Sequence, residues 1–531
     1  MLKRILSTLL LLFFLSACVR AAPTTDPAQT ADPAPETRSA NWWNEAVFYE
    51  IFVRSFYDSD GDGIGDFNGI TQKLDYLESL GVTALWLMPI HPSPSYHGYD
   101  VTDYYSVNSQ YGSMDDFKNL LAEAHKRDIH IIIDLILNHT SSQHPWFKAA
   151  NSDPNSQYRD YYVWSETSKG GKWHEGNQGY YFGLFWEGMP DLNYNNPAVT
   201  ADMLKVTDFW LNDIGIDGFR VDAAKHLIED GDKVENTPAT HEWYKSFYTE
   251  YKAQNPQAYT VGEVFGAGSS VIKSYTGDQL DQIFSFEMSS GFVNSANGGA
   301  NSGITSAIKF ALMDMPDFNF ATFLTNHDQT RAMSVFYGDV NKAKLASFLM
   351  LTSPGTPFIY YGEEIGMQGQ KPDEDLRLPM QWSNTENAGF TTVTPWRAPN
   401  KDYTTVNVTA QLDDPASLLN HYQTLIRLRK EHPALQSGDA ILLDTGNSAV
   451  FALLRINGDE SVLVLVNLGK TPISDYKLSL NETILTDGII TPVSIFGSAQ
   501  TQPLEIISGK FSEYKPLTEL PPYQTYLFDL K

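Results

Sequence analysis

Cysteine is almost absent from this sequence, which holds Cys18 alone among 531 residues. A disulfide within the chain and a cysteine-rich zinc site are therefore excluded. Basic residues are also few: 37 Lys and Arg stand against 64 Asp and Glu, giving a formal charge of −27. Such a charge repels phosphate backbones and argues against a nucleic-acid partner. Hydrophobic residues make up 42% of the chain, enough for a large core and too many for a mainly disordered protein.

An apolar run long enough to cross a membrane is also lacking at the N-terminus. Residues 5–15 are mainly apolar but too few to span a bilayer, and they follow Lys3 and Arg4. A basic region followed by a short apolar region predicts a signal peptide, here over residues 1–17. The rest of the chain is therefore expected outside the cytoplasm.

Cys18 ends the sequence Leu15-Ser-Ala-Cys18, which resembles a bacterial lipobox. The resemblance implies that Cys18 is lipidated, so that a lipid anchor alone holds the protein at the bacterial cell surface or the periplasmic membrane face. An ordinary secretory signal, cut after Ala17 or Ala22, is the alternative. Residues 18–40 are rich in Pro, Ala and Thr and hold no aromatic residue, which predicts a disordered tether.

From residue 41 onward, short apolar or β-branched runs alternate with stretches of helical spacing. Strands alternating with helices are typical of an α/β fold, and eight such strands predict a (β/α)₈ TIM barrel over residues 41–137 and 191–434. The expected strands are 47–56, 84–90, 129–138, 218–223, 258–264, 282–287, 321–328 and 357–363.

Two segments fall outside this alternation. The long interval after the third strand predicts an inserted subdomain over residues 138–190, whose many aromatic rings are expected mostly to pack its own core and in a few cases to act as stacking platforms. Residues 435–531 are rich in strand and turn signals, including the hairpin signal Asn457-Gly-Asp-Glu460. They predict a C-terminal antiparallel β domain.

Three carboxylates are expected to converge at the mouth of the barrel. Asp222, Glu263 and Asp328 each stand at the carboxyl end of a predicted strand, and Arg220 points to the same side as Asp222. Each acid alone could simply cap a helix or pair with an arginine. Together they repel one another, and such a group is kept for acid–base or nucleophilic chemistry or for a metal. Without a Cys/His cluster nearby, glycoside hydrolysis is the natural chemistry.

Four segments carry a resemblance to a known family. They are Asp134-Leu-Ile-Leu-Asn-His139, Gly218-Phe-Arg-Val-Asp222, Val261-Gly-Glu263 and Phe323-Leu-Thr-Asn-His-Asp328. From residue 41 to its end the chain resembles the α-amylase family, glycoside hydrolase family 13. The resemblance implies a retaining mechanism with Asp222 as nucleophile, Glu263 as general acid/base and Asp328 as transition-state stabiliser.

The same resemblance implies a set of substrate-binding residues. Arg220 would hold the nucleophile ionised, His139 and His327 would hydrogen-bond the sugar in subsite −1, and Tyr99 would stack beneath it. The remaining expected contacts are Lys225 and His226 after the nucleophile, and the pair Asp373 and Arg377 at the −2 sugar.

Specificity is expected to be that of an α-amylase acting as a monomer on α-1,4 bonds of starch-like glucans and maltooligosaccharides. Met189-Pro-Asp-Leu-Asn193 resembles the group between oligo-1,6-glucosidases and neopullulanases, and Pro379-Met-Gln-Trp382 resembles oligo-1,6-glucosidases. A neopullulanase-like or maltogenic hydrolase and a 4-α-glucanotransferase are the alternatives. A non-catalytic sugar-binding relative is a more distant one, because such relatives lose one of the three acids.

The loop after the first strand is expected to bind calcium. Asp58, Asp60 and Asp62 alternate as do the first ligands of an EF-hand loop, Ile64 would offer its carbonyl, and Asp66 takes the ninth place. The twelfth place lacks the usual glutamate, so the motif is incomplete, and a solvated acidic turn is the alternative. The family resemblance also implies a second ion held by the set Asn138, Asp191 and the carbonyl of His226.

Overall fold

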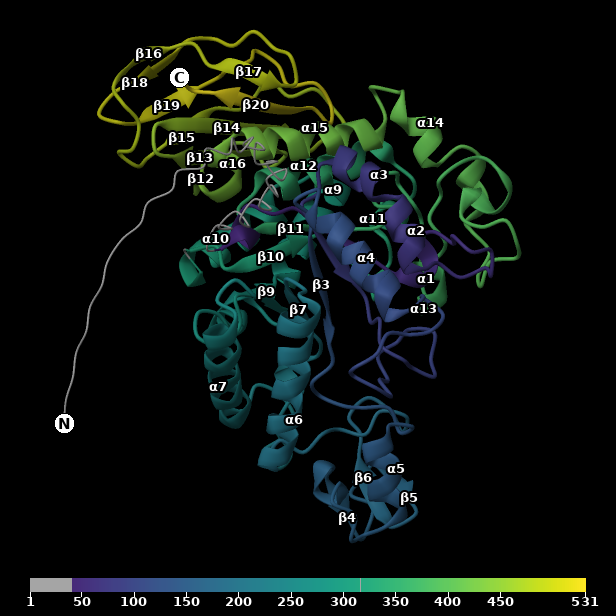
Figure 1. Cartoon of the computed structure of the whole chain (residues 1–531). Helices are drawn as coiled ribbons and strands as arrows, with labels where there is room; N and C mark the ends of the chain where they lie inside the picture. The colour runs from purple at the N-terminus through teal and green to yellow at the C-terminus, as the bar shows by residue number, and fades with distance from the viewer. Residues whose placement is uncertain (1–40, 316) are drawn as a thin grey trace, which may run out of the picture. The chain divides into compact units, whose positions relative to one another are not determined.

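The computed structural model describes residues 41–315 and 317–531. The predicted signal peptide, the predicted lipidation site Cys18 and the predicted tether lie outside the described residues. Within them, eight parallel strands close into a barrel (Figure 1), as predicted. In barrel order the strands are β1 (Phe48–Ile51), β2 (Ala84–Leu87), β3 (His130–Leu135), β7 (Gly218–Val221), β8 (Tyr259–Gly262), β9 (Gln282–Phe284), β10 (Phe320–Phe323) and β11 (Thr356–Tyr360).

The strands are shorter than the apolar runs that predict them. The expected strand 47–56 ends at Ile51, and Val53–Phe56 form a helical turn, α1. The expected strand 282–287 likewise ends at Phe284, and helix α9 (Phe286–Gly298) begins two residues later with Ser285 as its N-cap. An apolar run cannot distinguish a buried strand from a buried helical turn, because both are surrounded by core.

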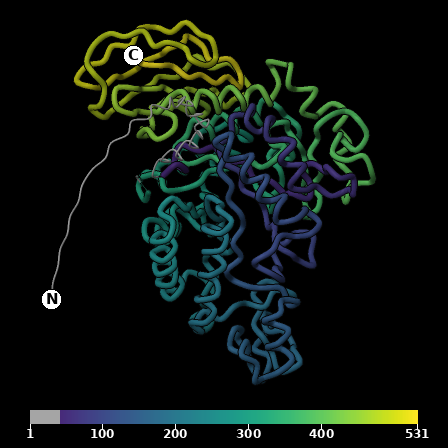
Figure 2. The backbone as a smooth tube through the Cα atoms, viewed as in Figure 1, coloured from purple at the N-terminus to yellow at the C-terminus, as the bar shows by residue number. Residues whose placement is uncertain are grey.

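Helices cover the outside of the barrel in Figures 1 and 2. A break at Lys73 divides the helical segment 67–80 into two helices, and Ser113 forms a capping box with Asp116 at the start of α4. The longer helices are α2 (Phe67–Gln72), α3 (Leu74–Leu80), α4 (Met114–His125), α6 (Pro197–Asp208) with η3 (Phe209–Ile214), α7 (Pro238–Gln254), α9, α10 (Ser302–Asp314), α12 (Val340–Thr352) and α15 (Leu418–Glu431). Short helical turns in the loops are η1 (Trp42–Asn44), η4 (Ala224–His226), α8 (Ser269–Ile272), η5 (Lys273–Tyr275), α11 (Ala332–Val335), α13 (Asp373–Leu376), η6 (Glu386–Gly389), η7 (Lys401–Thr404), α14 (Val408–Leu412) and α16 (Pro433–Ser437).

The excursion between β3 and α6 has its own small sheet. It contains α5 (Pro145–Ser152), η2 (Arg159–Tyr161) and an antiparallel sheet in the order β4 (Trp164–Ser165), β6 (Gly179–Phe182), β5 (Trp173–Gly176). Phe147 of α5 packs against Trp164 and Tyr181, with ring centroids 5.8 and 4.7 Å apart. These aromatic rings pack the insertion's own core, as expected.

The C-terminal part is antiparallel, as predicted. Within residues 439–529 one sheet has the order β12 (Asp439–Leu442), β13 (Val450–Asn457), β14 (Glu460–Asn467), β20 (Thr525–Asp529), β17 (Val493–Phe496). Two-stranded pairs join β15 (Leu478–Leu480) to β19 (Phe511–Tyr514) and β16 (Gly488–Ile490) to β18 (Leu504–Ile506). The expected hairpin connects β13 and β14, with Asn457 paired to Glu460. Arg455 of β13 donates to the carbonyl of Thr352 on α12 at 2.8 Å, which ties this sheet to the barrel helices.

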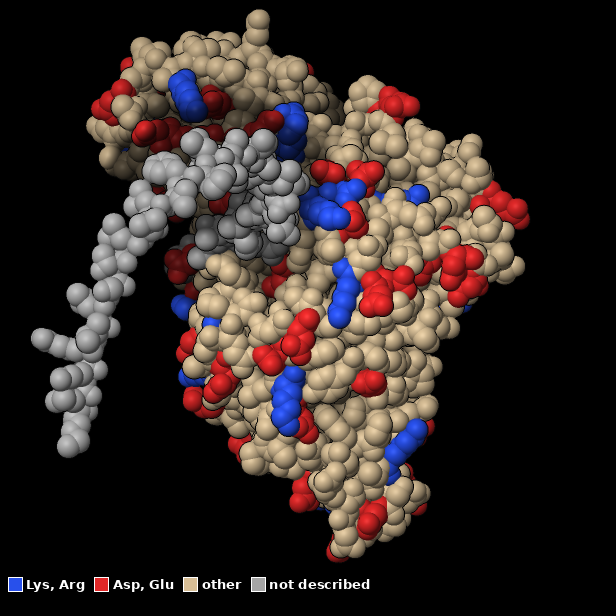
Figure 3. Space-filling model, viewed as in Figure 1, with Lys and Arg blue, Asp and Glu red and all other residues tan. Residues whose placement is uncertain are grey.

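The excess of acidic over basic residues in the composition is visible on the surface. On the face drawn in Figure 3, Asp and Glu side chains are spread widely, and the Lys and Arg side chains stand among them singly or in small groups. None of the helices within residues 41–315 and 317–531 is both long enough and apolar enough to span a bilayer.

Inward-facing side chains change character along the barrel strands. Phe48 and Glu50 on β1 share one face, as do Ile132 and Asp134 on β3. Phe48 and Ile132, nearer the N-terminal ends, belong to a buried apolar cluster. Glu50, Asp134 and Arg220, nearer the C-terminal ends, are buried polar groups. A polar layer therefore lies at the C-terminal mouth, where barrels of this kind place their sites.

Candidate active site

Arg220 joins three carboxylates at the mouth of the barrel. Its Nη1 donates to Asp134 Oδ1 at 2.6 Å and to Asp222 Oδ1 at 2.5 Å, and its Nη2 donates to Glu263 Oε2 at 2.7 Å. Asp222 follows the last residue of β7 and Glu263 follows the last residue of β8, so neighbouring strands deliver the two acids side by side. Charge-assisted bonds of this kind fix both the position and the orientation of the carboxylates.

Asp134 lies beneath this pair and is fully buried. Its second oxygen accepts a hydrogen bond from Trp86 Nε1 at 2.8 Å. Burial raises the pKa of Asp134 to about 7, against the opposing effect of the Arg220 charge. Asp134 therefore holds Arg220 from below, while Arg220 faces the two acids above it.

The proton affinity of Glu263 is set mainly by its burial. Burial raises the pKa of Glu263, and the charges of Asp222 and Asp328 raise it further, while Arg220 and His327 lower it. The net shift is upward. A glutamate with a raised pKa can keep its proton near neutral pH and deliver it to a leaving group.

Asp328 completes the set of acids from the loop after β10. Its Oδ1 accepts from Arg377 Nη2 at 2.8 Å, and its Oδ2 lies 3.3 Å from His327 Nε2. Burial favours the neutral form, but the charges of His327, Arg377 and Arg220 outweigh it and lower the pKa of Asp328. Asp328 is thus kept as a carboxylate at the cleft.

Tyr99 and the two expected histidines form a second group of contacts. Tyr99 Oη lies 2.8 Å from His327 Nε2, and the two rings stack with centroids 5.6 Å apart. His139 Nε2 lies 3.2 Å from the carbonyl of Tyr99. Tyr99 and His139 face the cleft, whereas His327 is fully buried below Tyr99 and Asp328.

These groups surround an open cleft of about 670 Å³. The structure brings the expected residues Tyr99, His139, Lys225, His226, Asp373 and Arg377 to this cleft together with the three acids. The cleft is also lined by His97, Met189, Ala223 and Lys371, to which the sequence assigned no contact with the substrate.

The expected pair Asp373 and Arg377 lies on the lining of the cleft. Arg377 Nη2 lies 3.9 Å from Asp373 Oδ2, while Lys371 contacts the other oxygen of Asp373. Arg377 also donates from Nε to the carbonyl of His327 at 3.1 Å. Arg377 therefore connects Asp373 to the loop that carries Asp328.

Three exposed aromatic rings lie on the lining of the cleft. Of the rings in the insertion, Phe185 is 49% exposed and Trp186 is 47% exposed, and Phe265 after β8 is 55% exposed. Lys225 Nζ lies 2.7 Å from Glu235 Oε2 and donates to the carbonyl of Phe265 at 3.1 Å. Exposed aromatic rings on the lining of a cleft can stack on the apolar faces of a sugar chain.

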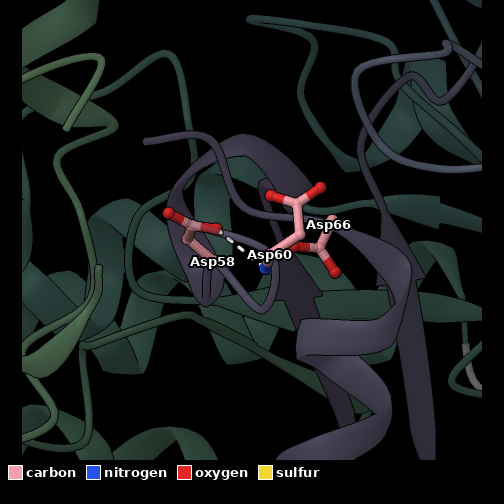
Figure 4. A group of neighbouring side chains, drawn as sticks. All are labelled: Asp58, Asp60 and Asp66. Carbon is pink, nitrogen blue, oxygen red and sulfur yellow. Dashed lines mark hydrogen bonds between the residues drawn. The ribbon is translucent and has the colours of Figure 1, made fainter. Parts of the chain in front are cut away.

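The loop after α1 groups three of the expected calcium ligands. Carboxylate oxygens of Asp58, Asp60 and Asp66 lie within 4.8 Å of one another, and Asp60 donates its N–H to Asp58 (Figure 4). Asp62 is outside this group and accepts from the N–H of Ile64 at 2.8 Å. Asp66 also accepts from Gly69 N–H as the N-cap of α2.

The expected second ion site is brought together in part. Asn138 Nδ2 donates to Asp191 Oδ2 at 3.1 Å, and burial raises the pKa of Asp191 well above its usual value. Among the described residues, the buried Oδ1 of Asn138 has no hydrogen-bond partner. His226 uses its ring Nδ1 toward the carbonyl of Val234 at 2.8 Å.

Known proteins resemble this chain over most of its length. Residues 50–438 match the family model described as "Alpha amylase, catalytic domain". The chain is 42% identical over 481 residues to Alpha-amylase 3 of Dictyoglomus thermophilum, covering 89% of this chain and 93% of that protein. It is 35% identical to the oligo-1,6-glucosidase of Parageobacillus thermoglucosidasius, covering 81% of this chain and 91% of that protein. The crystal structure of the alpha-amylase from H. orenii superposes with a TM-score of 0.80 at 39% identity, covering 92% of this chain and 99% of that one.

Proposed function

The chain belongs to the α-amylase family of glycosidases, and we propose that it hydrolyses α-1,4-glucosidic bonds of starch-like glucans and maltooligosaccharides with retention of configuration. The observation that carries this proposal is the contact of one guanidinium, that of Arg220, with both Asp222 and Glu263 at the cleft. Retaining glycosidases keep their two carboxyl groups only about 5–5.5 Å apart, so that one can attack the sugar directly. Asp222 and Glu263 contact neighbouring nitrogens of one guanidinium, and this proximity supports the proposed retaining mechanism.

In the proposed reaction Asp222 attacks the anomeric carbon and forms a covalent glycosyl-enzyme. Glu263 gives its proton to the leaving oxygen, then takes a proton from the water that attacks the intermediate. Asp328 stays ionised beside the oxocarbenium-like transition state and stabilises its positive charge. Arg220 neither binds nor releases a proton; its two nitrogens keep the acids in place through both steps.

The proposed bond specificity rests on a relative of this chain and on the side chains that line the cleft. The similarity to Alpha-amylase 3 over most of both chains supports α-1,4 cleavage. The exposed rings of Trp186 and Phe265, together with Lys225, favour binding of a further sugar, which would also assist glucan transfer. Transfer is therefore the second candidate activity.

Product analysis distinguishes these activities. We expect maltooligosaccharides from amylose, with the α-anomer formed first in a proton NMR time course. Dominant release of glucose from isomaltose would indicate an oligo-1,6-glucosidase, panose from pullulan a neopullulanase-like enzyme, and chain lengthening of maltotriose a glucanotransferase. The β-anomer as first product would overturn the retaining mechanism.

We further propose that calcium binds the loop of Asp58, Asp60 and Asp66 and stabilises the fold. Carboxylate oxygens are the donors that calcium prefers, and three of them converge here. Loss of hydration raises the pKa of Asp60, and the charges of Asp62, Asp66 and Asp58 raise it further; a bound cation would relieve this repulsion. Gly63 N–H and Thr391 Oγ1 donate to Asp58 and keep the loop in shape without the ion.

Removal of calcium should lower the midpoint of thermal unfolding by several degrees. A ligand at 100 times its Kd stabilises the folded state by about 2.7 kcal/mol. The test compares wild type with the double variant Asp60→Ala/Asp62→Ala, each with chelator and with added calcium. The double variant Asp413→Ala/Asp414→Ala removes the same charge from another exposed turn and serves as control. If chelation leaves the wild-type midpoint unmoved, or the loop variant still responds to calcium, the loop is not the stabilising site.

The lipid anchor proposed for Cys18 has a direct test in cells. Cys18→Ala removes the sulfur that would carry the lipid, so the variant should leave the membrane fraction or accumulate as unprocessed precursor. Enzyme activity per folded molecule should be unchanged, because the variant leaves the cleft intact. Membrane fractionation equal to that of wild type would exclude lipidation at this residue.

A further inference from the structure

Glu50 is a buried carboxylate below the cleft with no role in the reaction described above. It lies on β1 with its side chain inside the barrel and is 2% exposed. Its Oε1 lies 2.5 Å from Nδ1 of His327 on the loop after β10. The preceding residue, Tyr49, points the other way and donates its hydroxyl to Glu364 at 2.8 Å. β1 thus directs the side chain of Glu50 into the barrel toward His327, and that of Tyr49 outward toward Glu364.

The second ring nitrogen of His327 also faces oxygen. Nε2 lies 2.8 Å from Tyr99 Oη and 3.3 Å from Asp328 Oδ2. A neutral imidazole carries a single N–H, so it can donate to one carboxylate only. An imidazolium donates from Nδ1 to Glu50 and from Nε2 to Tyr99 Oη, and its positive charge attracts Asp328. The edge of Trp86 packs against the ring, with centroids 5.6 Å apart, and restricts its rotation.

We propose that Glu50 is a positioning residue that keeps His327 doubly protonated and oriented, and that His327 in turn keeps Asp328 ionised and Tyr99 in place. This role of Glu50 rests on the proposed hydrolysis, because Asp328 stabilises a transition state only if the enzyme carries out that reaction. Glu50 on β1 thus acts through the buried ring of His327 on Asp328 and Tyr99, the two groups that face the sugar. Glu50 itself touches no substrate, because it lies below His327, which is fully buried.

The charges around His327 support this arrangement. Burial lowers the pKa of His327, but the charges of Asp328 and Glu50 and the hydrogen bond to Glu50 outweigh it, so the net shift is upward. The charged and titratable groups that face the ring are Glu50 from β1, Asp134 from β3, Glu263 from the end of β8, Asp328 from its own loop, and Arg377 and Tyr99.

The substitution Glu50→Gln tests the proposal because it keeps the size and the hydrogen-bonding oxygen but removes the charge. The pKa of His327 should then fall, and above that pKa His327 donates to only one partner. We expect kcat to drop about 10- to 100-fold at neutral and alkaline pH, on the scale of losing the outer hydrogen-bond partner of a metal-binding histidine. At lower pH, where His327 is protonated again, most of the loss should disappear. The alkaline limb of the kcat profile therefore moves to lower pH, while KM changes little.

Glu364→Gln is the matched control, because Glu364 is an equally buried carboxyl that accepts hydroxyls of Tyr49 and Tyr76 away from the cleft. Its alkaline limb should stay in place. A loss of kcat in Glu50→Gln that is equal at all pH values would show a purely structural role and overturn the proposal. If Glu50→Gln does not fold, Glu50→Asp retains the charge but lengthens the contact. Glu50→Asp should then move the alkaline limb of the kcat profile to lower pH, by less than is expected for Glu50→Gln. An alkaline limb at the wild-type pH would overturn the proposal.

A readout without substrate separates this inference from the proposed function. Nitrogen-15 NMR of labelled histidine, with His327 assigned through His327→Gln, reports both ring nitrogens directly. In wild type both should remain protonated well above pH 6.5, the usual pKa of histidine, and in Glu50→Gln the ring should titrate at lower pH. Unchanged titration would overturn the role of Glu50. A wild type that titrates as expected but cleaves no α-glucan would overturn the proposed function alone.

Discussion

Replacement of Asp222 by asparagine is expected to lower kcat on maltooligosaccharides by about 10⁴-fold or more, the scale seen when a covalent nucleophile is removed. The amide has nearly the size of the carboxylate but cannot attack the anomeric carbon. Circular dichroism and the thermal midpoint should show an intact fold. The measurement is kcat from reducing-end release, compared with Asp339→Asn. Asp339 caps α12 by accepting from Asn341 N–H, a role that asparagine fills equally well.

The identity of Asp222 as nucleophile can be checked by chemical rescue. In Asp222→Ala the side chain is removed, and azide can occupy its place and attack the anomeric carbon from the face opposite the leaving group. The expected product is a glycosyl azide of inverted configuration, formed at a rate that rises with azide concentration. Turnover of Asp222→Asn within tenfold of wild type, or an azide product of retained configuration, would refute the assignment.

Glu263→Gln should lower kcat on maltooligosaccharides by about 10²- to 10⁴-fold, the usual contribution of a general acid or base. An aryl maltoside with an acidic phenol as leaving group needs no proton, so formation of the glycosyl-enzyme from it should be affected far less. Single-turnover release of the phenol measures this first step alone. An equal loss with both substrates would mean that Glu263 does not act as the acid.

The pH dependence follows from the raised pKa of Glu263. The proton donor must be protonated, so kcat/KM falls as pH rises through this pKa. Burial raises the pKa above the usual 4.5 of a glutamate, so the enzyme should retain activity at pH values where a solvent-exposed glutamate is ionised. In Glu263→Gln this alkaline limb should be lost for the aryl substrate. A limb that persists unchanged in the variant belongs to another group.

The barrel strands could be predicted because each is buried on both faces and therefore appears as a mainly apolar or β-branched run. Their ends could not be predicted in the same way. Residues 53–56 are as buried as β1 itself, and only the backbone turn from Phe52 to Ser55 ends the strand. The motif-bearing acids were accessible to prediction because Asp222 and Glu263 directly follow β7 and β8, and Asp328 lies on the loop after β10.

Two features of the site depend on packing between distant segments. Glu50 meets His327 across 277 residues, and the only local signal is a charged residue at an inward position of an otherwise apolar strand. The choice of Phe185 and Trp186 among the insertion's rings depends on how Phe147 and Tyr181 pack its core and leave these two exposed. The sequence alone cannot distinguish the rings that pack the core of the insertion from those that remain exposed at the cleft.

The polar layer at the mouth of the barrel sets a limit on how stable this enzyme can become. Buried charges cost folding free energy even when they are paired, and well-packed apolar replacements often stabilise a protein by about 1–4 kcal/mol. Glu50, Asp134 and Arg220 are therefore the positions where selection for heat resistance alone would act against catalysis. The apolar layer around Phe48 and Ile132 carries no such conflict. If variants are selected in the laboratory for thermal stability alone, with no selection for activity, the charged residues at the mouth should be replaced first. The apolar layer around Phe48 and Ile132 should stay unchanged.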